Sequence, residues 1–529
     1  MNAENTSRKH SLSRGNIVLI CLFAVYAVLT FIGAANHEIW YDEAQAWCIA
    51  RDNDIPGIIT AMRTEGHPPL WHFVLYPFTR MGFTADIMPF ISWFITLISA
   101  GLMLWKAPFR PLAKGIILFS GGFLFYWSVT SRVYCLLVLV LVLLAIVYKN
   151  RNRFPVVYGI LVAILANTHI MMCGLVGILG IFMIIDLFKL WKSSKPSDNT
   201  KKIIGLLIAG AGVICLVLPL LGSFKSVNIG NSNTISPGYA VSKIYNSLPD
   251  IMEGILMDGN RNLPLHSIRY LIRVLYSICL ILALILLRHY KRSLIIHIVF
   301  AAFFITISEI MWFMIPTRAF IFLFMFVFVF WLALDTETPV VHQHRPVASI
   351  TSPKLKKALE QIRQADLNFK HWYMVIICFV CVSSVPMGGF ILVSDIFSDY
   401  SQSKKAAEYI RENLPSGSVL VVKNELFSQY SAYLPEYRFY SINYNSFVTY
   451  SFETKPEKNE VEKDSSDIDC EQVYQDLKDL DNVYFLDFSM ISPLPDDKII
   501  YRSENSLLGS GNQSDTYVNI SKFDIEDIK

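Results

Sequence analysis

Residues 16–47 read NIVLICLFAVYAVLTFIGAANHEIWYDEAQAW, a long apolar run followed at once by a polar and aromatic stretch. The apolar part, residues 16–35, has the length of about 20 residues that a helix needs to cross the hydrocarbon core of a bilayer. It is too long for a signal peptide, and Ala34-Ala35-Asn36-His37 is a poor cleavage site. We therefore expect a first membrane span that is retained in the mature protein.

Ten further apolar runs follow, and the composition agrees with them. The chain of 529 residues is 53% hydrophobic and 17% charged, whereas soluble proteins carry roughly a quarter charged residues. The sequence thus predicts a polytopic α-helical membrane protein with about 11 transmembrane helices. The predicted spans are residues 16–35, 86–105, 115–129, 132–148, 154–168, 170–190, 203–222, 268–287, 293–312, 318–334 and 372–394.

The connectors between these runs alternate in their content of Lys and Arg. Positive residues are enriched in cytoplasmic loops, so the basic connectors are expected inside and the others outside. This alternation predicts a multi-pass protein of the cell membrane with a cytoplasmic N-terminus. Residues 351–367 place basic and apolar residues on opposite faces and should form an interfacial helix on the cytoplasmic leaflet. The basic connectors are residues 1–15, 106–114, 149–153, 191–202, 288–292 and 335–371.

The last part of the chain differs in charge and in pattern from the first 394 residues. Residues 395–529 hold 25 acidic and 13 basic residues, a net charge of −12 in a chain whose total is +3. Alternating helix and strand patterns predict a soluble, extracytoplasmic α/β domain that follows a membrane module of residues 1–394. We expect it to shape a substrate site or to assist assembly. The predicted elements are helices at 403–414 and 470–480 and strands at 418–422, 437–442 and 482–488.

The first extracytoplasmic loop, residues 36–85, is the most informative segment for function. About 50 residues is long for a connector, and long ordered loops are usually functional. Its aromatic residues recur with helical spacing, which predicts amphipathic helices lying at the membrane interface.

Two adjacent acids, Asp42 and Glu43, stand near the start of this loop. Asp-Glu-Ala-Gln at 42–45 fits a capping box, with Asp42 as N-cap and Gln45 three residues later. A carboxylate there can equally serve as the general base for an acceptor hydroxyl. The two interpretations are compatible, because an N-cap residue lies at the open end of its helix.

Basic residues occur at the predicted outer ends of several spans. Arg132 and Arg318 each begin a span on the side where positive residues are disfavoured. A guanidinium fork suits a phosphate group, and contact with lipid headgroups is the alternative. His67 precedes two prolines and is expected at a helix start, and His169 lies between two spans at an outer end.

Four short motifs follow one another along the chain: WYDEAQAW at 40–47, GHPPLW at 66–71, SRVY at 131–134 and NTH at 167–169. Together they resemble the GT-C superfamily of membrane glycosyltransferases. The most similar branch comprises bacterial proteins related to protein O-mannosyltransferases and to the lipid A aminoarabinose transferase. The resemblance covers roughly residues 15–190 by motif, and the rest of the chain by its order of many spans and then an outer domain.

This resemblance implies an inverting transfer of a sugar from a polyprenyl-phosphate donor at the outer face of the membrane. It makes Asp42 the general base and Glu43 its paired acid. Some relatives use a divalent metal such as Mg or Mn and others use none. If this chain binds one, Asp42, Glu43 and His67 are the expected ligands. The residues to which it gives substrate-binding or phosphate-binding roles are His67, Arg132, Tyr134, His169 and, by its kind and place alone, Arg318.

The expected partners are the lipid-linked sugar donor, the bilayer and a glycan, lipid or protein acceptor, and no nucleic acid. A transporter or flippase of lipid-linked glycans is an alternative, but it would need ionisable residues near the bilayer midplane. The intramembrane acids are few, chiefly Asp186 and Glu309. A GT-C-like scaffold without activity is a third interpretation, which the intact motif set disfavours.

Overall fold

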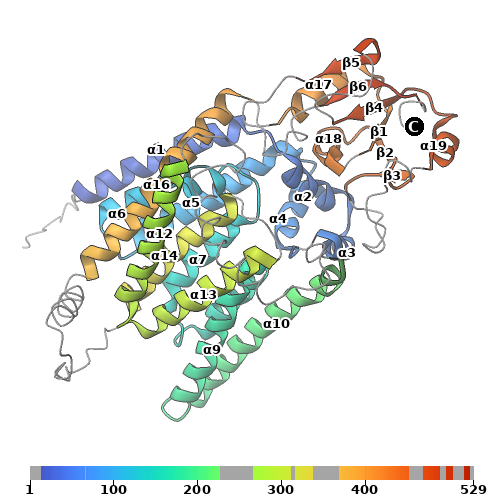
Figure 1. The fold of residues 1–529 in the computed structure, drawn as a ribbon. Coiled ribbons are helices and arrows are strands. Elements are labelled where there is room, and N and C mark those ends of the chain that lie inside the picture. The colour runs from blue at the N-terminus through green and yellow to red at the C-terminus, as the bar shows by residue number, and fades with distance from the viewer. Residues whose placement is uncertain are drawn as a thin grey trace, which may run out of the picture.

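A computed structural model of the chain describes residues 14–65, 67–226, 266–310, 316–336, 369–398, 401–423, 425–451, 469–488, 496–503 and 518–524. Most of these residues lie in a bundle of helices, and a small mixed sheet stands at one end of the bundle (Figure 1). The interfacial helix expected at 351–367 lies outside the described residues.

Six helices in the described part of the chain are long and apolar enough to cross a membrane. Three further apolar helices are shorter: α7 (Tyr134–Tyr148), α8 (Pro155–Ala166) and the second part of α12 (His266–Leu287). The chain therefore has the character of a membrane protein, and the count of 11 spans stays a prediction. The six helices are α1 (Arg14–Asn36), α5 (Met88–Lys106) with the turn before it, α9 (Cys173–Leu190), α10 (Pro196–Ser226), α14 (Pro316–Thr336) and α16 (Phe369–Phe397).

The helices differ in which surfaces they bury. α1 leaves apolar side chains such as Val18 and Val28 more than half exposed, as expected of a helix that faces lipid. α14 is buried on all sides, because it lies among α7, α16 and α13 (Lys291–Ile310). A helix that is apolar all round belongs in the interior of a bundle, and α14 forms the centre of this one.

Residues 115–129 do not form the continuous span that their composition suggested. α6 (Pro111–Leu118) ends after two turns, and a short π-helix follows at Gly122–Tyr126. The backbone at Gly121 is pressed against α14 and α16: a Cβ there would lie 2.7 Å from the Phe320 ring and 2.8 Å from the Ser384 carbonyl oxygen. The prediction of one helix is wrong because close tertiary packing at Gly121, which the composition does not show, interrupts it.

The first loop forms three short helices, α2 (Tyr41–Asp52), α3 (Ile55–Glu65) and α4 (Leu70–Arg80), as its aromatic spacing predicted. They lie between the bundle and the sheet (Figure 1). Trp47 and Trp71 are buried with Leu75 in a core that α5 and the start of α7 complete. α4 begins at Leu70 with Pro69 as its N-cap, directly after the helix start that was expected at His67-Pro68-Pro69.

The sheet domain contains six strands, and they run in the spatial order β3-β2-β1-β4-β6-β5. β1 pairs in parallel with β2 and β4, and the outer pairings are antiparallel. The helices and strands predicted at 403–414, 418–422, 437–442, 470–480 and 482–488 are confirmed, and β3, β5 and β6 were not predicted. The strands are β1 (Val419–Val422), β2 (Arg438–Ser441), β3 (Ser446–Val448), β4 (Val483–Asp487), β5 (Ile499–Arg502) and β6 (Asn519–Lys522).

Helices cover both faces of this sheet, which explains why β1 is apolar at every position. Leu420 and Val422 pack under α17 (Ser403–Asn413) and α18 (Ser428–Tyr433). Val419 and Val421 face α19 (Cys470–Leu477) on the other side. Successive strand side chains point to opposite faces, so a strand buried on both faces needs a continuous apolar run.

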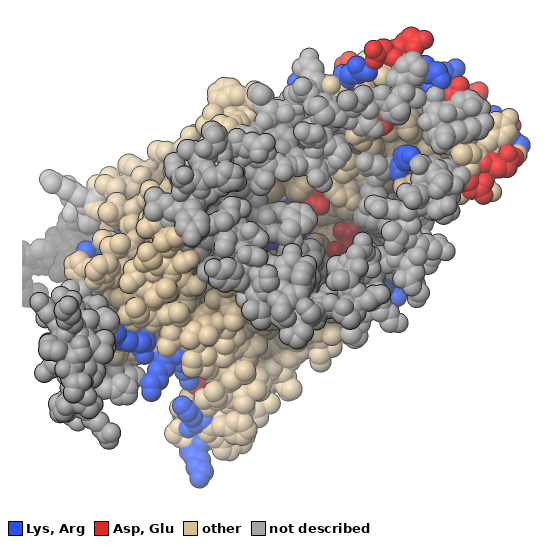
Figure 2. Space-filling view, in the orientation of Figure 1, with Lys and Arg blue, Asp and Glu red and all other residues tan. Residues whose placement is uncertain are grey.

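The sheet domain docks on α2 through α18 and the chain after β3. The Gln45 side-chain oxygen accepts from the Ser428 hydroxyl at 2.5 Å and from the Ser451 N–H at 3.1 Å, and its NH₂ group donates to the Ser451 carbonyl at 2.8 Å. On the face shown in Figure 2, the Lys and Arg side chains of the bundle gather at its end remote from this domain, and the domain itself shows Asp and Glu together with some Lys and Arg. The domain is thus fixed to one end of the bundle, next to the first-loop helices.

Candidate functional site

A cavity of about 180 Å³ lies where the first-loop helices meet the beginnings of α7 and of the turn before α9. Five of the seven residues predicted for the site line it: Asp42, His67, Arg132, Tyr134 and His169. They come from three separate parts of the chain: Asp42, Arg132 and Tyr134 stand at or just before the starts of α2 and α7, and His67 and His169 lie in the turns between helices. The rest of the lining is Tyr41, Gln45, Ala46, Glu65, Pro68, Trp71, His72, Val133 and Thr168.

Asp42 and Arg132 form an ion pair at this cavity, between carboxylate Oδ2 and guanidinium Nη1. The Asp42 side chain is 34% exposed and that of Arg132 is 12% exposed. The Arg132 guanidinium carbon also lies 5.9 Å from the ring centroids of Trp40 and Tyr134, which is within cation–π range. The acid expected as base and the cation expected for phosphate are therefore direct neighbours.

Helix α2 begins two residues earlier than the capping-box interpretation required. Trp40 is the N-cap, which makes Asp42 the second helical residue and Glu43 the third. The Glu43 carboxylate accepts from the Trp40 backbone N–H at 3.0 Å, as the third residue of a capping box does. The cap assigned to Asp42 is wrong for this reason, and Glu43 provides it instead.

Glu43 lies behind the cavity wall, with a fully buried side chain. Its carboxylate accepts from the backbone N–H of Ser131, the residue before Arg132, and lies 3.1 Å from His37 Nε2. The other ring nitrogen of His37, Nδ1, is 2.8 Å from Asp395 Oδ2 at the end of α16. Glu43 thus joins the ends of α1 and α16 to the turn that carries Arg132.

His37 is the cation that balances the two buried acids. Burial alone would lower its pKa, but the charges of Asp395 and Glu43 raise the pKa of His37 well above its usual value. A doubly protonated ring donates from both nitrogens, which matches its position between two carboxylates. A buried charge is tolerated when it is paired and hydrogen-bonded, and this arrangement meets that condition.

The other histidines of the site have the opposite electrostatic character. Burial, with the charges of Arg132 and Arg318, lowers the pKa of His67 to about 3. Burial and Arg132 lower the pKa of His72 to about 4. Burial also lowers the pKa of His169 well below its usual value, assisted by Arg318 and Arg132. These imidazoles are neutral at pH 7, so the positive charge of the cavity belongs to arginine.

The His169 ring has a defined orientation. Its Nδ1 accepts from the Met171 backbone N–H at 3.2 Å, so a neutral ring carries its proton on Nε2. The ring stacks on Tyr134 with centroids 5.6 Å apart and lies 5.8 Å from the His67 ring. Tyr134, His169 and His67 therefore form a row of flat side chains along one wall.

Arg318 begins α14 and is buried, with 7% of its surface exposed. It is outside the described lining of the cavity, yet its charge lowers the pKa of both His67 and His169, which places it near them. Its assignment to phosphate binding stays a prediction.

The three residues expected to hold a metal do not converge as a ligand set. Asp42 faces Arg132, while Glu43 is engaged by His37 and by backbone N–H groups on the other side of the wall. In the described ranges, no three His, Cys, Asp or Glu side chains gather as a metal-binding group. Binding of a divalent metal stays a prediction, and we derive no step through one.

Four residues of the site and its support were not predicted. His72 and Gln45 line the cavity, and His37 and Asp395 hold Glu43. Asp395 carried a usable signal, since an acid inside an apolar run is costly and calls for a partner. The partner, His37, is 358 positions away, and no local pattern connects the two.

The comparisons with known proteins add no assignment: no family model matches the chain, and no curated protein matches it.

Proposed function

We propose that the chain is a membrane glycosyltransferase that moves a sugar from a polyprenyl-phosphate donor to a cell-envelope acceptor, with inversion at the sugar carbon. The observation that supports this most is the convergence of Asp42, His67 and Arg132 on one cavity. The sequence separates these residues widely, and a chain without this chemistry has no need to bring a carboxylate, a neutral imidazole and a guanidinium together beside apolar helices.

In this proposal the arginines bind the donor phosphate. Arg132 offers a planar fork of N–H donors that matches phosphate oxygens, and Arg318 adds positive charge near His67 and His169. His67 and His169 are neutral, so they can donate or accept hydrogen bonds, and the charge that attracts the phosphate belongs to the arginines. Fixed cations at the leaving group stabilise the charge that develops as the glycosidic bond breaks.

Asp42 acts as the base in the same step. Its carboxylate takes the proton from the acceptor hydroxyl, and the hydroxyl oxygen then forms a bond to the anomeric carbon of the sugar. The bond from that carbon to the phosphate oxygen breaks, and its electron pair leaves with polyprenyl phosphate. No nucleotide is consumed, since the energy for transfer is carried by the phosphate ester of the donor.

The ion pair between Asp42 and Arg132 then represents the state before the donor binds. A phosphate group that enters the cavity competes with Asp42 for the guanidinium. As Arg132 turns to the phosphate, the Asp42 carboxylate is released to accept the acceptor's proton. Donor binding thus prepares the base, which limits unproductive reaction with water.

The charge distribution supports an outer location for this chemistry. The turn between α9 and α10 carries Lys192 and Lys195, and Lys201 follows in the second turn of α10. Figure 1 places this turn at the end of the bundle opposite α2–α4. Under the positive-inside rule this turn is cytoplasmic. The cavity and the sheet domain then stand at the extracytoplasmic face, where lipid-linked sugars and cell-envelope acceptors meet.

The test is to incubate the purified full-length protein in nanodiscs with a panel of polyprenyl-phosphate sugars and to measure released polyprenyl phosphate by mass spectrometry. We expect release from at least one donor, and a fall of about 10²–10⁴-fold in the Asp42→Asn variant with donor binding retained. Asp54→Asn is the matched control, because Asp54 is exposed and accepts from the Gly57 N–H at the start of α3. Full activity of Asp42→Asn, or no release from any donor, would refute the proposal.

A further inference from the structure

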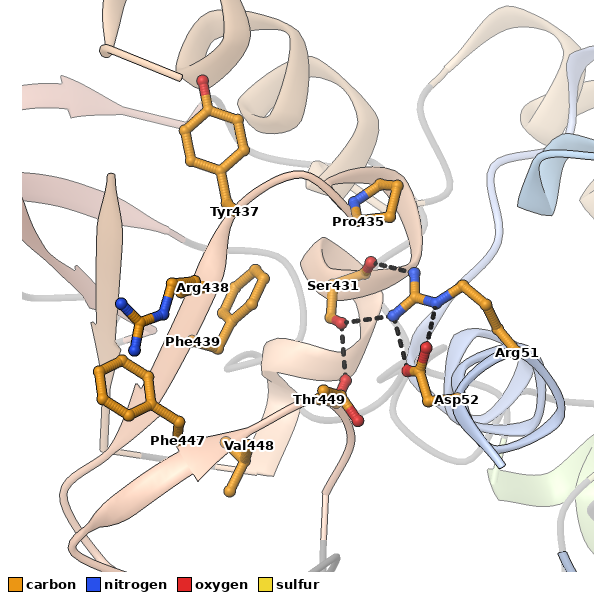
Figure 3. A pocket seen from close by; sticks show the side chains of 10 residues that line it. All are labelled: Arg51, Asp52, Ser431, Pro435, Tyr437, Arg438, Phe439, Phe447, Val448 and Thr449. Carbon is orange, nitrogen blue, oxygen red and sulfur yellow. Dashed lines mark hydrogen bonds and ion pairs between the residues drawn. The ribbon is translucent and has the colours of Figure 1, made fainter. Parts of the chain in front are cut away.

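A second cavity, of about 400 Å³, lies at the junction of α2 with the β2–β3 edge of the sheet domain (Figure 3). Arg51 and Asp52 in the last turn of α2 form one wall. Arg438, Phe439 and Phe447 from the two strands form the other. This site contains none of the residues that line the first cavity.

On the α2 wall, the charges of Arg51 and Asp52 balance one another, and hydrogen bonds hold the pair in place. Arg51 binds both carboxylate oxygens of Asp52, with Nε–Oδ1 at 2.7 Å and Nη2–Oδ2 at 2.8 Å. Its Nη1 donates to the Ser431 carbonyl at 2.7 Å, so the sheet domain holds the pair in place (Figure 3). Such fixed, planar polar groups present hydrogen-bonding edges at defined positions, as the vicinal hydroxyls of a sugar ring require.

The opposite wall combines an aromatic surface with a positive charge. The Arg438 guanidinium lies 3.9 Å from the centroid of the Phe447 ring, and both side chains are exposed. Within the described ranges, no carboxylate pairs with Arg438. Arg438 is therefore a local positive charge that can pair with an anionic group of a ligand at this wall, against the net charge of −12 of the domain as a whole.

The geometry relative to the first cavity is set by α2 itself. Asp42 and Arg51 are nine positions apart on one helix, which corresponds to about 14 Å along its axis. A ligand held at the second cavity is therefore kept at a fixed distance from the proposed base. At about 100° per residue, Asp42 and Arg51 also point to opposite sides of α2. A ligand that reaches both cavities must therefore pass around this helix, which a chain of several sugars can do and a single sugar cannot.

We infer that the second cavity binds an acidic sugar unit of a glycan acceptor, with the carboxylate on Arg438, the ring against Phe447 and hydroxyls on the Arg51–Asp52 pair. This inference rests on the proposed glycosyltransferase function for its biological meaning, because it defines the acceptor as an anionic glycan. A peptide that extends the sheet at β3 is the competing ligand, but β3 has only three residues with which to pair.

The experiment measures equilibrium binding of a trimer of galacturonic acid to the full-length protein in nanodiscs, with the neutral galactose trimer as the comparison probe. We expect the acidic trimer to bind more tightly than the neutral one. Arg438→Gln should weaken its binding about tenfold or more, as loss of a charged hydrogen-bonding partner does, and Phe447→Leu should weaken it as well. Arg502→Gln, on the opposite edge strand β5, is the matched control and should bind normally.

Equal binding of the two trimers, absence of binding, or normal binding by Arg438→Gln would each overturn the inference. Tighter, Arg438-dependent binding of an acidic peptide would overturn it in favour of the peptide. The result is separable from the proposed function, because binding requires no transfer. If the trimer binds and no donor releases polyprenyl phosphate, the proposed function fails and the binding site stands. If release occurs and the trimer does not bind, only this inference fails.

Discussion

At the start of α2, successive side chains point about 100° apart around the helix axis, so Asp42 and Glu43 face different surroundings. Asp42 is partly exposed at the cavity, while Glu43 is fully buried and holds the backbone before Arg132. In the proposed function, Asp42 is the acid that reacts and Glu43 is the acid that positions the turn before Arg132. Their adjacency in the sequence suggests two equivalent carboxylates, and the helix separates their roles.

We expect Glu43→Gln to destabilise the protein by about 3 kcal/mol, since it removes one charge from a buried pair and leaves the His37 cation under-compensated. The paired comparison is Asp42→Asn, which breaks a partly exposed ion pair and should cost about 1 kcal/mol or less. Thermal unfolding of both variants in the same detergent measures the difference. Equal melting temperatures would contradict the positioning role of Glu43.

The lowered pKa of His72 predicts a dependence of stability on pH. The pKa of His72 is about 4 in the folded chain, below its value of about 6.5 in the unfolded chain. Between pH values of about 4 and 6.5, His72 is therefore protonated in the unfolded chain and neutral in the folded one. Stability therefore falls as the pH drops from 7 to 5, by about 2 kcal/mol from this group. His67 and His169 shift in the same direction. The raised pKa of His37 affects the pH dependence of stability only above about pH 6.5, the pKa of an unfolded histidine, because only there does the unfolded chain lose a proton that folded His37 keeps.

Melting curves of the protein and of His72→Asn at pH 7 and pH 5 test this expectation. The loss of stability between the two values should be smaller in the variant. An identical loss in both proteins would mean that His72 takes up its proton in the folded state.

At the scale of helices and strands, the sequence predicts the elements that a local apolar pattern determines. It does not predict the elements that form through contacts with distant residues. The boundaries of α17, β1, β2 and β4 follow from apolar periodicity and agree with the structure to within one residue. β5 and β6 are short and partly polar, so their strand character comes from pairing with β4 and with each other. The break at Gly121 likewise comes from packing against α14 and α16, which no hydropathy pattern reports.

Gly121→Ala should destabilise the bundle by about 1–3 kcal/mol, the usual cost of overpacking, because the added methyl group meets the Phe320 ring and the Ser384 carbonyl. Gly210→Ala is the matched control: Gly210 is exposed in α10 with no atom within 4 Å of an added Cβ. That change should be neutral or stabilising, since Ala favours a helix over Gly. If both variants melt like the parent protein, the close packing at Gly121 is not present in solution.

At the scale of the whole molecule, the candidate site is a property of one end of the bundle. The sequence could anticipate that four of the site residues lie on the same side of the membrane, because Asp42 and His67 were expected in the outer loop 36–85 and Arg132 and His169 at outer ends of spans. It could not anticipate that Asp395 secures Glu43 through His37, or that Gln45 belongs at once to the cavity and to the junction with the sheet domain. These contacts join segments that are hundreds of residues apart.

The proposed orientation predicts which surfaces a membrane-impermeant maleimide can reach in intact cells. In a Cys470→Ser background, Lys423→Cys on the exposed surface of the sheet domain should be labelled without permeabilisation. Lys192→Cys, exposed at the turn after α9, should be labelled only after the membrane is opened. The reverse pattern would place the cavity in the cytoplasm and exclude donors presented on the outer leaflet.

The bond between His37 and Asp395 also has a consequence for biosynthesis. Ribosomes add roughly 5–20 residues per second, so Asp395 is made roughly 20–70 seconds after His37. Throughout that interval Glu43 and His37 lack the partner that completes their network, and the turn before Arg132 lacks its final anchor. The turn that carries Arg132 therefore reaches its final arrangement only after the last predicted span has been made, so we expect the cavity to form late in biosynthesis.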